Sequence, residues 1–116
     1  MKTKIRNEYR MKRHSPKNLL ELGFNNKYNM ASGSCKYYSI KFPVVKYNEM
    51  ASINGEIVVD SENGDTYVNV YGLMDEPYAP FYDSRTTGYE DILDIINRNI
   101  RKKMKELGVK KRKLQA

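Results

Sequence analysis

Two runs rich in β-branched and aromatic residues stand on either side of a short polar turn, and they constrain the fold more than any other feature of the chain. The runs are residues 56–60 (EIVVD) and 66–71 (TYVNVY). Between them, Asn63-Gly64 supplies the positive φ that a tight reversal needs. The pattern predicts an antiparallel hairpin, because two strands joined by so short a connection run in opposite directions.

The second run also predicts how the two faces of this hairpin differ. Side chains alternate along a strand, so Val68 and Val70 share one face, while Tyr67, Asn69 and Tyr71 share the other. If the valines meet the helices, the tyrosines cover the open face, where they could stack on bases or on a protein partner. The alternative is that they only stabilise the sheet through cross-strand pairing.

A further strand is predicted upstream of the hairpin. Tyr38, Ile40 and Phe42 alternate with more polar residues, which is the pattern of a half-buried strand. Pro43 cannot donate to a β-ladder, so this strand either lies at an edge or bends there. The sheet is therefore expected to have three or four antiparallel strands.

A long helix is predicted near the C-terminus. Thr87 and Glu90 match a capping box at its start, and Gly108 is placed to end it. Between these signals, apolar residues recur at spacings of three and four, which is one helical stripe. The stripe consists of Tyr89, Ile92, Leu93, Ile96, Ile100, Met104 and Leu107.

A shorter helix is predicted after Ser15-Pro16, because Ser15 can accept from free N–H groups of the first turn and Pro16 suits the first helical position. Gly23 ends it. Its apolar face is expected to comprise Leu19, Leu20 and Leu22.

These elements together predict an α+β fold with a short N-terminal helix, a three- to four-stranded antiparallel sheet and a long C-terminal helix packed on one face. Residues 15–108 are expected to form this single domain. A flexible basic arm, residues 1–14, is expected before it, and a basic C-terminal tail, residues 109–116, after it.

Charge is sorted along the chain. Residues 1–17 hold seven Lys/Arg and one acidic residue, and residues 98–116 hold nine and one. The segment between them holds five basic and twelve acidic residues. Two basic ends around an acidic middle predict a surface for polyanions, provided that the fold brings the ends together.

The leading interpretation is therefore a non-enzymatic protein that binds nucleic acid or a nucleoprotein through its basic termini. Each basic side chain would neutralise a phosphate and release counterions. Charge of this kind positions a protein on the phosphate backbone but carries no base specificity. The candidate binding residues are Lys12, Arg13, Arg101, Lys102, Lys105, Lys110, Lys111, Arg112 and Lys113.

An alternative interpretation uses the acidic middle. A protein-binding inhibitor of a host defence system would occupy a partner's basic groove with acidic side chains and with the aromatic segment 78–82. The candidate residues for this role are Asp75, Glu76, Tyr78, Phe81, Tyr82 and Asp83.

Catalysis and metal binding have little support in the sequence. The single histidine, His14, stands in the basic arm, where it cannot be held as a general base. One His and one Cys, Cys35, cannot form a structural zinc site. We expect no enzyme activity, no cofactor and no metal.

The expected location is the bacterial cytoplasm. A single cysteine excludes an internal disulfide and fits a reducing compartment. No apolar run approaches the ~20 residues that a membrane-spanning helix needs, and the basic N-terminus is not followed by the apolar stretch of a secretory signal. No membrane partner is expected.

Two resemblances bear on these interpretations. The order helix, strands, helix resembles the double-stranded RNA-binding domain in topology only, because the basic cluster of that family is replaced here by residues 87–91 (TGYED). The segments 57–71 and 78–82, with the Ile-rich helix that ends at Val109, are similar to small uncharacterised phage and prophage proteins of low-GC Gram-positive bacteria. The second resemblance implies a phage-type accessory protein, of the kind that includes anti-CRISPR inhibitors, with no activity to transfer.

Overall fold

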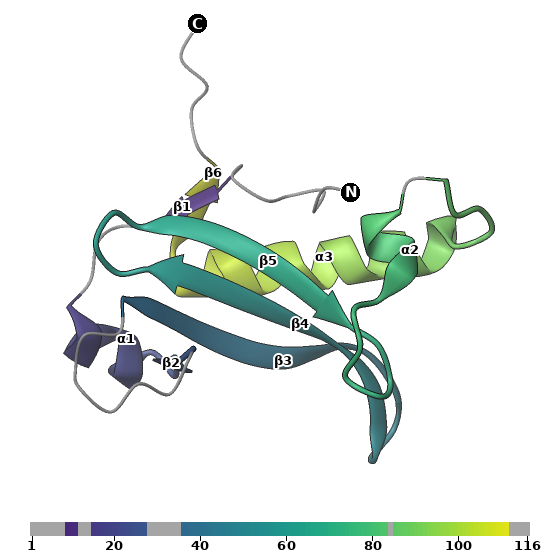
Figure 1. Ribbon diagram of the computed structural model, residues 1–116, viewed down its shortest axis with the longest axis horizontal. Coiled ribbons are helices and arrows are strands. Elements are labelled where there is room, and N and C mark those ends of the chain that lie inside the picture. Colours follow the sequence, from purple (N-terminus) through teal and green to yellow (C-terminus); the bar gives the residue numbers. More distant parts are fainter. Residues whose placement is uncertain (1–8, 12–14, 28–35, 84, 112–116) are drawn as a thin grey trace, which may run out of the picture.

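The computed structural model describes residues 9–11, 15–27, 36–83 and 85–111. Six strands and three helices lie within these ranges (Figure 1). In chain order they are β1 (Tyr9–Met11), α1 (Pro16–Glu21), β2 (Asn25–Asn26), β3 (Tyr37–Asn48), β4 (Ala51–Asp60), β5 (Asp65–Tyr71), α2 (Ala79–Tyr82), α3 (Glu90–Leu107) and β6 (Val109–Lys111).

All six described strands belong to one sheet with the order β2-β3-β4-β5-β1-β6. The strands β2 to β5 follow one another in the chain and pair in that order, so they form a four-stranded antiparallel meander. The short strands β1 and β6 extend the sheet beyond β5. The predicted α+β class with an antiparallel sheet is confirmed.

The hairpin predicted at Asn63-Gly64 is confirmed as the connection between β4 and β5. Its register pairs Val59 with Thr66 and Glu56 with Asn69. Gly64 has φ +82°, the left-handed conformation that glycine adopts at no steric cost. The Gly64 N–H donates to the Asp60 carbonyl oxygen at 2.7 Å and closes the turn.

The strand β3 continues past Pro43, as the sequence suggested. The pairing of β3 with β4 shifts register between Pro43 and Val45 and again between Lys46 and Asn48. Such irregularities bend a strand and increase its twist. The far end of the β3–β4 hairpin accordingly curves away from the rest of the sheet in Figure 1.

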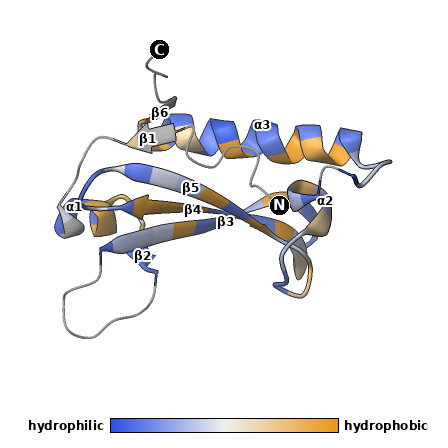
Figure 2. Cartoon of the chain, turned by 45° about the horizontal axis from the view of Figure 1, so that its top comes forward, coloured by the Kyte–Doolittle hydropathy of each residue, from blue (hydrophilic) through white to orange (hydrophobic). Residues whose placement is uncertain are grey.

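The helix α3 lies against one face of the sheet, and Figure 2 shows its apolar side turned toward the strands. Ile96 and Ile100 are fully buried in the core, which β4 and β5 also line with buried residues such as Ile57 and Val68. Gly55 permits this close approach, because a Cβ atom there would lie 3.0 Å from Val44 Cγ1 and 3.4 Å from Ile100 Cγ1.

Of the two predictions about the ends of α3, one is wrong and one is confirmed. The predicted capping box at Thr87 is wrong, because α3 begins at Glu90 after Tyr89, which makes no side-chain cap. Gly88, with φ +85°, turns the backbone between Thr87 and the helix and so removes Thr87 from the cap position. Gly108, with φ +79°, ends α3 as predicted.

The predicted start of α1 is confirmed, because Ser15 Oγ accepts from the Asn18 N–H at 3.2 Å. Its predicted apolar face is only partly buried. Leu19 joins the core, whereas Leu20 and Leu22 are exposed. A helix of six residues packs on the core with a single turn, and Leu19 is the leucine of that turn that is buried.

Candidate functional site

The two basic ends of the chain meet in the sheet. The strands β1 and β6 pair in antiparallel register, with Arg10 opposite Lys110 and Tyr9 opposite Lys111. Met11 pairs with Val109, and both side chains are buried. The sheet therefore takes in residues 9–11 and 109–111, which the sequence interpretation placed in the arm and the tail. The two buried apolar residues explain why these otherwise basic segments join the fold.

The C-terminal half of α3 adds an exposed basic stripe, defined here as Arg98, Arg101, Lys102 and Lys105. These four residues follow the spacing i, i+3, i+4, i+7, so they share one face of the helix. All four are exposed, and they lie opposite the buried side that carries Ile96 and Ile100. Gly108 alone separates α3 from β6, so the stripe leads directly to the paired basic strands.

The basic stripe carries uncompensated charge. None of its four residues forms an ion pair in the part of the chain that the structure describes. The neighbouring Lys103 differs, since its Nζ lies 3.8 Å from Glu106 Oε2 and 5.7 Å from the centre of the Phe42 ring. The four residues of the basic stripe are thus the basic side chains of α3 that make no ion pair with a described residue.

The predicted nucleic-acid-binding residues fall into three groups. Arg101, Lys102 and Lys105 are exposed members of the basic stripe. Lys110 and Lys111 have their backbone in β6. The remaining four lie outside the described residues, namely Lys12, Arg13, Arg112 and Lys113.

Three carboxylates of the acidic middle form ion pairs with lysines of the same segment. The ion pairs are Lys27–Glu56 at 2.8 Å, Lys36–Asp60 at 3.6 Å and Lys41–Asp75 at 2.7 Å. One acidic residue lies near the basic ends, because Asp65 of β5 is opposite Arg10 in the register. Among the described residues, these three ion pairs involve no cation of the basic stripe.

The open face of the sheet is built around Glu56, which is 5% exposed at the middle of β4. Its Oε1 atom accepts from Lys27 Nζ at 2.8 Å, Asn69 Nδ2 at 3.1 Å and the Tyr71 hydroxyl at 2.9 Å. Its Oε2 atom accepts a second bond from Lys27 Nζ at 2.9 Å. Every one of these donors comes from the same face, opposite the face that packs on α3.

These bonds set the protonation of the network. Burial raises the pKa of Glu56, but the hydrogen bonds from Lys27, Asn69 and Tyr71 outweigh it, so the pKa lies below its ordinary value. Burial and the bond to Glu56 together raise the pKa of the Tyr71 hydroxyl. An ionised carboxylate that accepts four hydrogen bonds is held as a fixed acceptor and is a poor proton donor.

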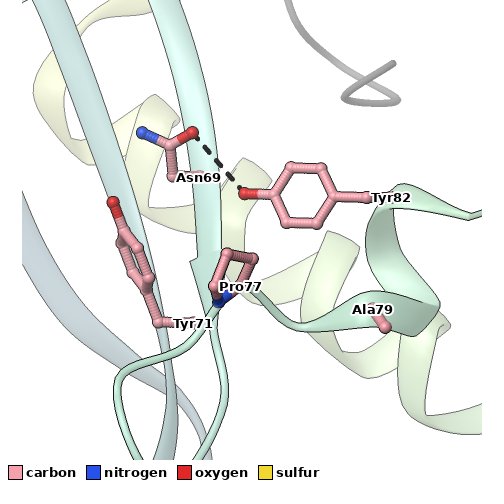
Figure 3. A pocket seen from close by; sticks show the side chains of 5 residues that line it. All are labelled: Asn69, Tyr71, Pro77, Ala79 and Tyr82. Atoms are coloured by element: carbon pink, nitrogen blue, oxygen red, sulfur yellow. Dashed lines mark hydrogen bonds between the residues drawn. The ribbon is translucent and has the colours of Figure 1, made fainter. Parts of the chain in front are cut away.

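A groove opens beside this network, between β5 and α2. It has a volume of about 470 Å³ and is lined by Asn69, Tyr71, Pro77, Ala79 and Tyr82. Figure 3 shows the Tyr82 side chain reaching from α2 toward Asn69 on β5, with the Tyr71 ring on the other side of Pro77. The Tyr82 hydroxyl accepts from the Val70 N–H at 2.8 Å. This bond gives the Val70 N–H a partner in the part of β5 that β1 does not cover, since β1 pairs with Asp65 and Thr66 of that strand.

The aromatic residues of the alternative protein-binding interpretation differ in how far they are exposed. Phe81 is fully buried in the core, so its side chain is not on the surface that a partner would contact. Tyr78 is half-buried, and burial together with the nearby phenols of Tyr47 and Tyr89 raises its pKa.

The acidic members of that set have partners of their own. Asp75 pairs with Lys41, and Asp83 accepts two bonds from the Arg85 guanidinium at 3.1 and 3.2 Å. The Arg85 bonds hold the pKa of Asp83 below its ordinary value. Glu76 is exposed, and its Oε2 atom accepts from the Met74 N–H at 3.1 Å.

Sequence reasoning missed Glu56 and Lys27. A usable signal was present, because the turn at Asn63-Gly64 sets the register and thereby places Glu56 opposite Asn69. A charged residue inside a β-branched strand, aligned with a polar residue across the hairpin, indicates a polar network on that face. No such signal marks Lys27, which reaches Glu56 from the turn after β2.

Within the described ranges, no helix is long and apolar enough to cross a membrane, and no group of three His, Cys, Asp or Glu side chains is placed to hold a metal ion. Comparisons of the chain with protein-family models, with curated proteins and with solved structures find no match. A proposal about function therefore rests on the positions and contacts of the side chains described above.

Proposed function

We propose that this chain is a non-enzymatic accessory protein of phage type that binds nucleic acid, free or within a nucleoprotein, through its two basic termini. The observation that carries the proposal is the pairing of β1 with β6, which places Arg10 opposite Lys110. A surface for polyanions requires that the two basic ends lie together. The pairing supports this, because it places a segment of each end in adjacent strands.

The basic stripe on α3 supports the same reading. Its four cations are exposed, share one helix face and continue into β6. Their side chains form no ion pair with the described carboxylates, so no described carboxylate competes with phosphates for them. A duplex that replaces condensed counterions with such a surface gains affinity at low salt.

The contacts expected from this surface are to phosphates. Lysine and arginine side chains on a rigid helix fix the position of a nucleic acid without reading its bases. We therefore expect similar affinity for duplexes of unrelated sequence, and a steep loss of affinity as salt increases.

The test compares two charge-matched variants of the full chain. Arg101→Gln with Lys105→Gln removes two cations from the basic stripe, whereas Lys46→Gln with Arg85→Gln removes two exposed cations from the segment between the basic ends. Fluorescence anisotropy with a short labelled DNA duplex at low salt should show about a tenfold weaker affinity for the first variant and little change for the second. Equal affinities in the two variants would contradict the proposal.

A further inference from the structure

We propose that the groove between β5 and α2 binds a segment of a protein partner that inserts a tryptophan side chain and carries lysines or arginines on either side of it. The helix α2, which lines the groove, lies beside the N-terminal half of α3, whereas β1 and β6 lie beside its C-terminal half (Figure 1). This site is therefore separate from the basic surface, and it does not depend on nucleic-acid binding.

The lining of the groove selects a flat apolar group. The rings of Tyr71, Tyr82 and Pro77 and the methyl group of Ala79 form most of it. A volume of about 470 Å³ is within the range of sites that enclose a large side chain or a small ligand. Aromatic anchors seated in such hollows dominate the energy of many protein interfaces.

The surroundings of Tyr71 argue against a cationic insert. Lys41 Nζ already lies 4.4 Å from the centre of the Tyr71 ring, and Lys27 Nζ lies 6.0 Å from it. A third cation on this ring would be repelled by the two that are present, since like charges at such distances disfavour each other. The inserted group is accordingly uncharged.

The polar atoms at the floor of the groove favour tryptophan among the uncharged aromatics. Asn69 Nδ2 donates to Glu56, whereas Asn69 Oδ1 accepts, among the described residues, a long 3.5 Å bond from the Tyr82 hydroxyl. A carbonyl oxygen with so weak a partner can accept a hydrogen bond from an indole N–H. Tryptophan supplies that donor together with the largest apolar surface.

The rim of the groove selects basic flanks. The loop that leads from Tyr71 to Pro77 exposes Leu73 and Met74, with Met74 88% exposed. The same loop carries Glu76 and Asp75, both exposed, and Asp75 also pairs with Lys41 at 2.7 Å. Residues 72–97, which form this loop, α2 and the first half of α3, contain six acidic residues and one basic residue. An apolar hollow inside an acidic rim complements an apolar anchor between basic residues.

The groove is also formed before any partner arrives. The Gly72 N–H donates to the Glu76 carbonyl oxygen at 2.7 Å, and the Tyr78 N–H donates to the Val70 carbonyl oxygen at 2.9 Å. Tyr71 and Pro77 form an antiparallel bridge between these two bonds. A site whose backbone is already held in place loses little entropy when it binds.

The probe is a short synthetic peptide with one central tryptophan between pairs of lysines, titrated into the ¹⁵N-labelled full chain. We expect saturable NMR shifts at the amides of Asn69, Tyr71, Ala79 and Tyr82. A peptide with serine in place of tryptophan should produce no saturable shift, and one with glutamates in place of the lysines should bind at least tenfold more weakly.

Two single variants test whether the peptide binds in the groove, and a double variant tests its acidic rim. Ala79→Leu fills the groove from an exposed position on α2, and it should weaken binding at least tenfold. Thr87→Leu adds an apolar side chain at an exposed position outside the lining and should leave the affinity unchanged. Asp75→Asn with Glu76→Gln should lower the affinity several-fold.

Each opposite result overturns a part of the proposal. Absent saturable shifts, or equal affinity of the tryptophan and serine peptides, exclude the anchor. Equal affinity of the glutamate peptide excludes the basic flanks, and unchanged binding by the Ala79→Leu variant excludes the groove. Shifts at the groove that depend on protein concentration without peptide would show that a second copy of this chain is the occupant instead.

Discussion

Arg10 and Lys110 lie opposite each other in adjacent antiparallel strands, although they come from opposite ends of the chain. Two neighbouring cationic residues do not attract each other, so the attraction that holds this pair of strands lies elsewhere. Met11 and Val109, the adjacent pair in the register, are both buried in the core. The buried Met11–Val109 pair and the pairing of β1 with both β5 and β6 therefore bring the two terminal segments together.

Met11→Ala should loosen this pair without removing any charge. Replacing a buried methionine by alanine typically costs about 2–5 kcal/mol of unfolding free energy. We expect lower stability in urea denaturation, faster amide hydrogen exchange in β1 and β6, and weaker binding to a DNA duplex at low salt. If the strands exchange faster while duplex affinity is unchanged, strand pairing does not organise the binding surface.

Glu56→Gln tests the network on the open face. The substitution keeps the shape of the side chain but removes the charge that Lys27 faces in a nearly buried position. Leaving such a partner unpaired costs about 1–3 kcal/mol of unfolding free energy at neutral pH. Urea denaturation at pH 7 measures the loss, and Glu90→Gln, at an exposed position on α3, serves as the control.

The same network predicts how stability depends on pH. The folded-state pKa of Glu56 lies below its ordinary value of 4.5. Its stabilising contribution is therefore complete above that ordinary value and is lost as the pH falls through the lower folded-state pKa. The difference in unfolding free energy between wild type and Glu56→Gln should shrink at acidic pH. A difference that stays constant from pH 7 down to pH 3 would mean that the pKa of Glu56 is the same in the folded and unfolded states.

Gly55→Ala should destabilise the contact between α3 and the sheet. The added Cβ atom would lie 3.0 Å from Val44 Cγ1 and 3.3 Å from Phe42 Cζ, with Ile100 on the helix close behind. Overpacking of this kind costs about 1–3 kcal/mol. Thermal unfolding of the variant beside wild type checks the value, and an unchanged melting temperature would show that the core repacks freely around position 55.

Tyr82→Phe should expose the edge of β5. The Val70 N–H loses its 2.8 Å acceptor, and an unsatisfied backbone donor costs about 1–3 kcal/mol when it is buried. The amide of Val70 should exchange faster with solvent. Tyr89→Phe removes the hydroxyl of an exposed residue and should have no effect on this amide.

The parts of the fold that the sequence predicted are those set by local pattern. The hairpin at Asn63-Gly64 and the stripe of α3 depend on neighbours within a few residues, and both are present. The capping box failed because Gly88 redirects the backbone, which residue spacing does not reveal.

Contacts between distant segments were out of reach. The pairing of β1 with β6 depends on one buried apolar pair within two basic segments, so no periodic pattern marks either strand. The groove requires α2 to lie beside β5, and the sequence identified Tyr82 only as part of an aromatic segment. The exposure of Arg101, Lys102 and Lys105, in contrast, followed from their place opposite the apolar stripe.

The salt dependence of duplex binding tests the central claim most directly, because it counts the phosphates that the surface neutralises. We predict a linear fall of log Kobs with log salt concentration, and a slope that is smaller by about 2 in Arg101→Gln with Lys105→Gln than in wild type. The control with Lys46→Gln and Arg85→Gln should keep the wild-type slope. Equal slopes in all three proteins would show that the basic stripe does not contact phosphate, and the proposed function would be wrong.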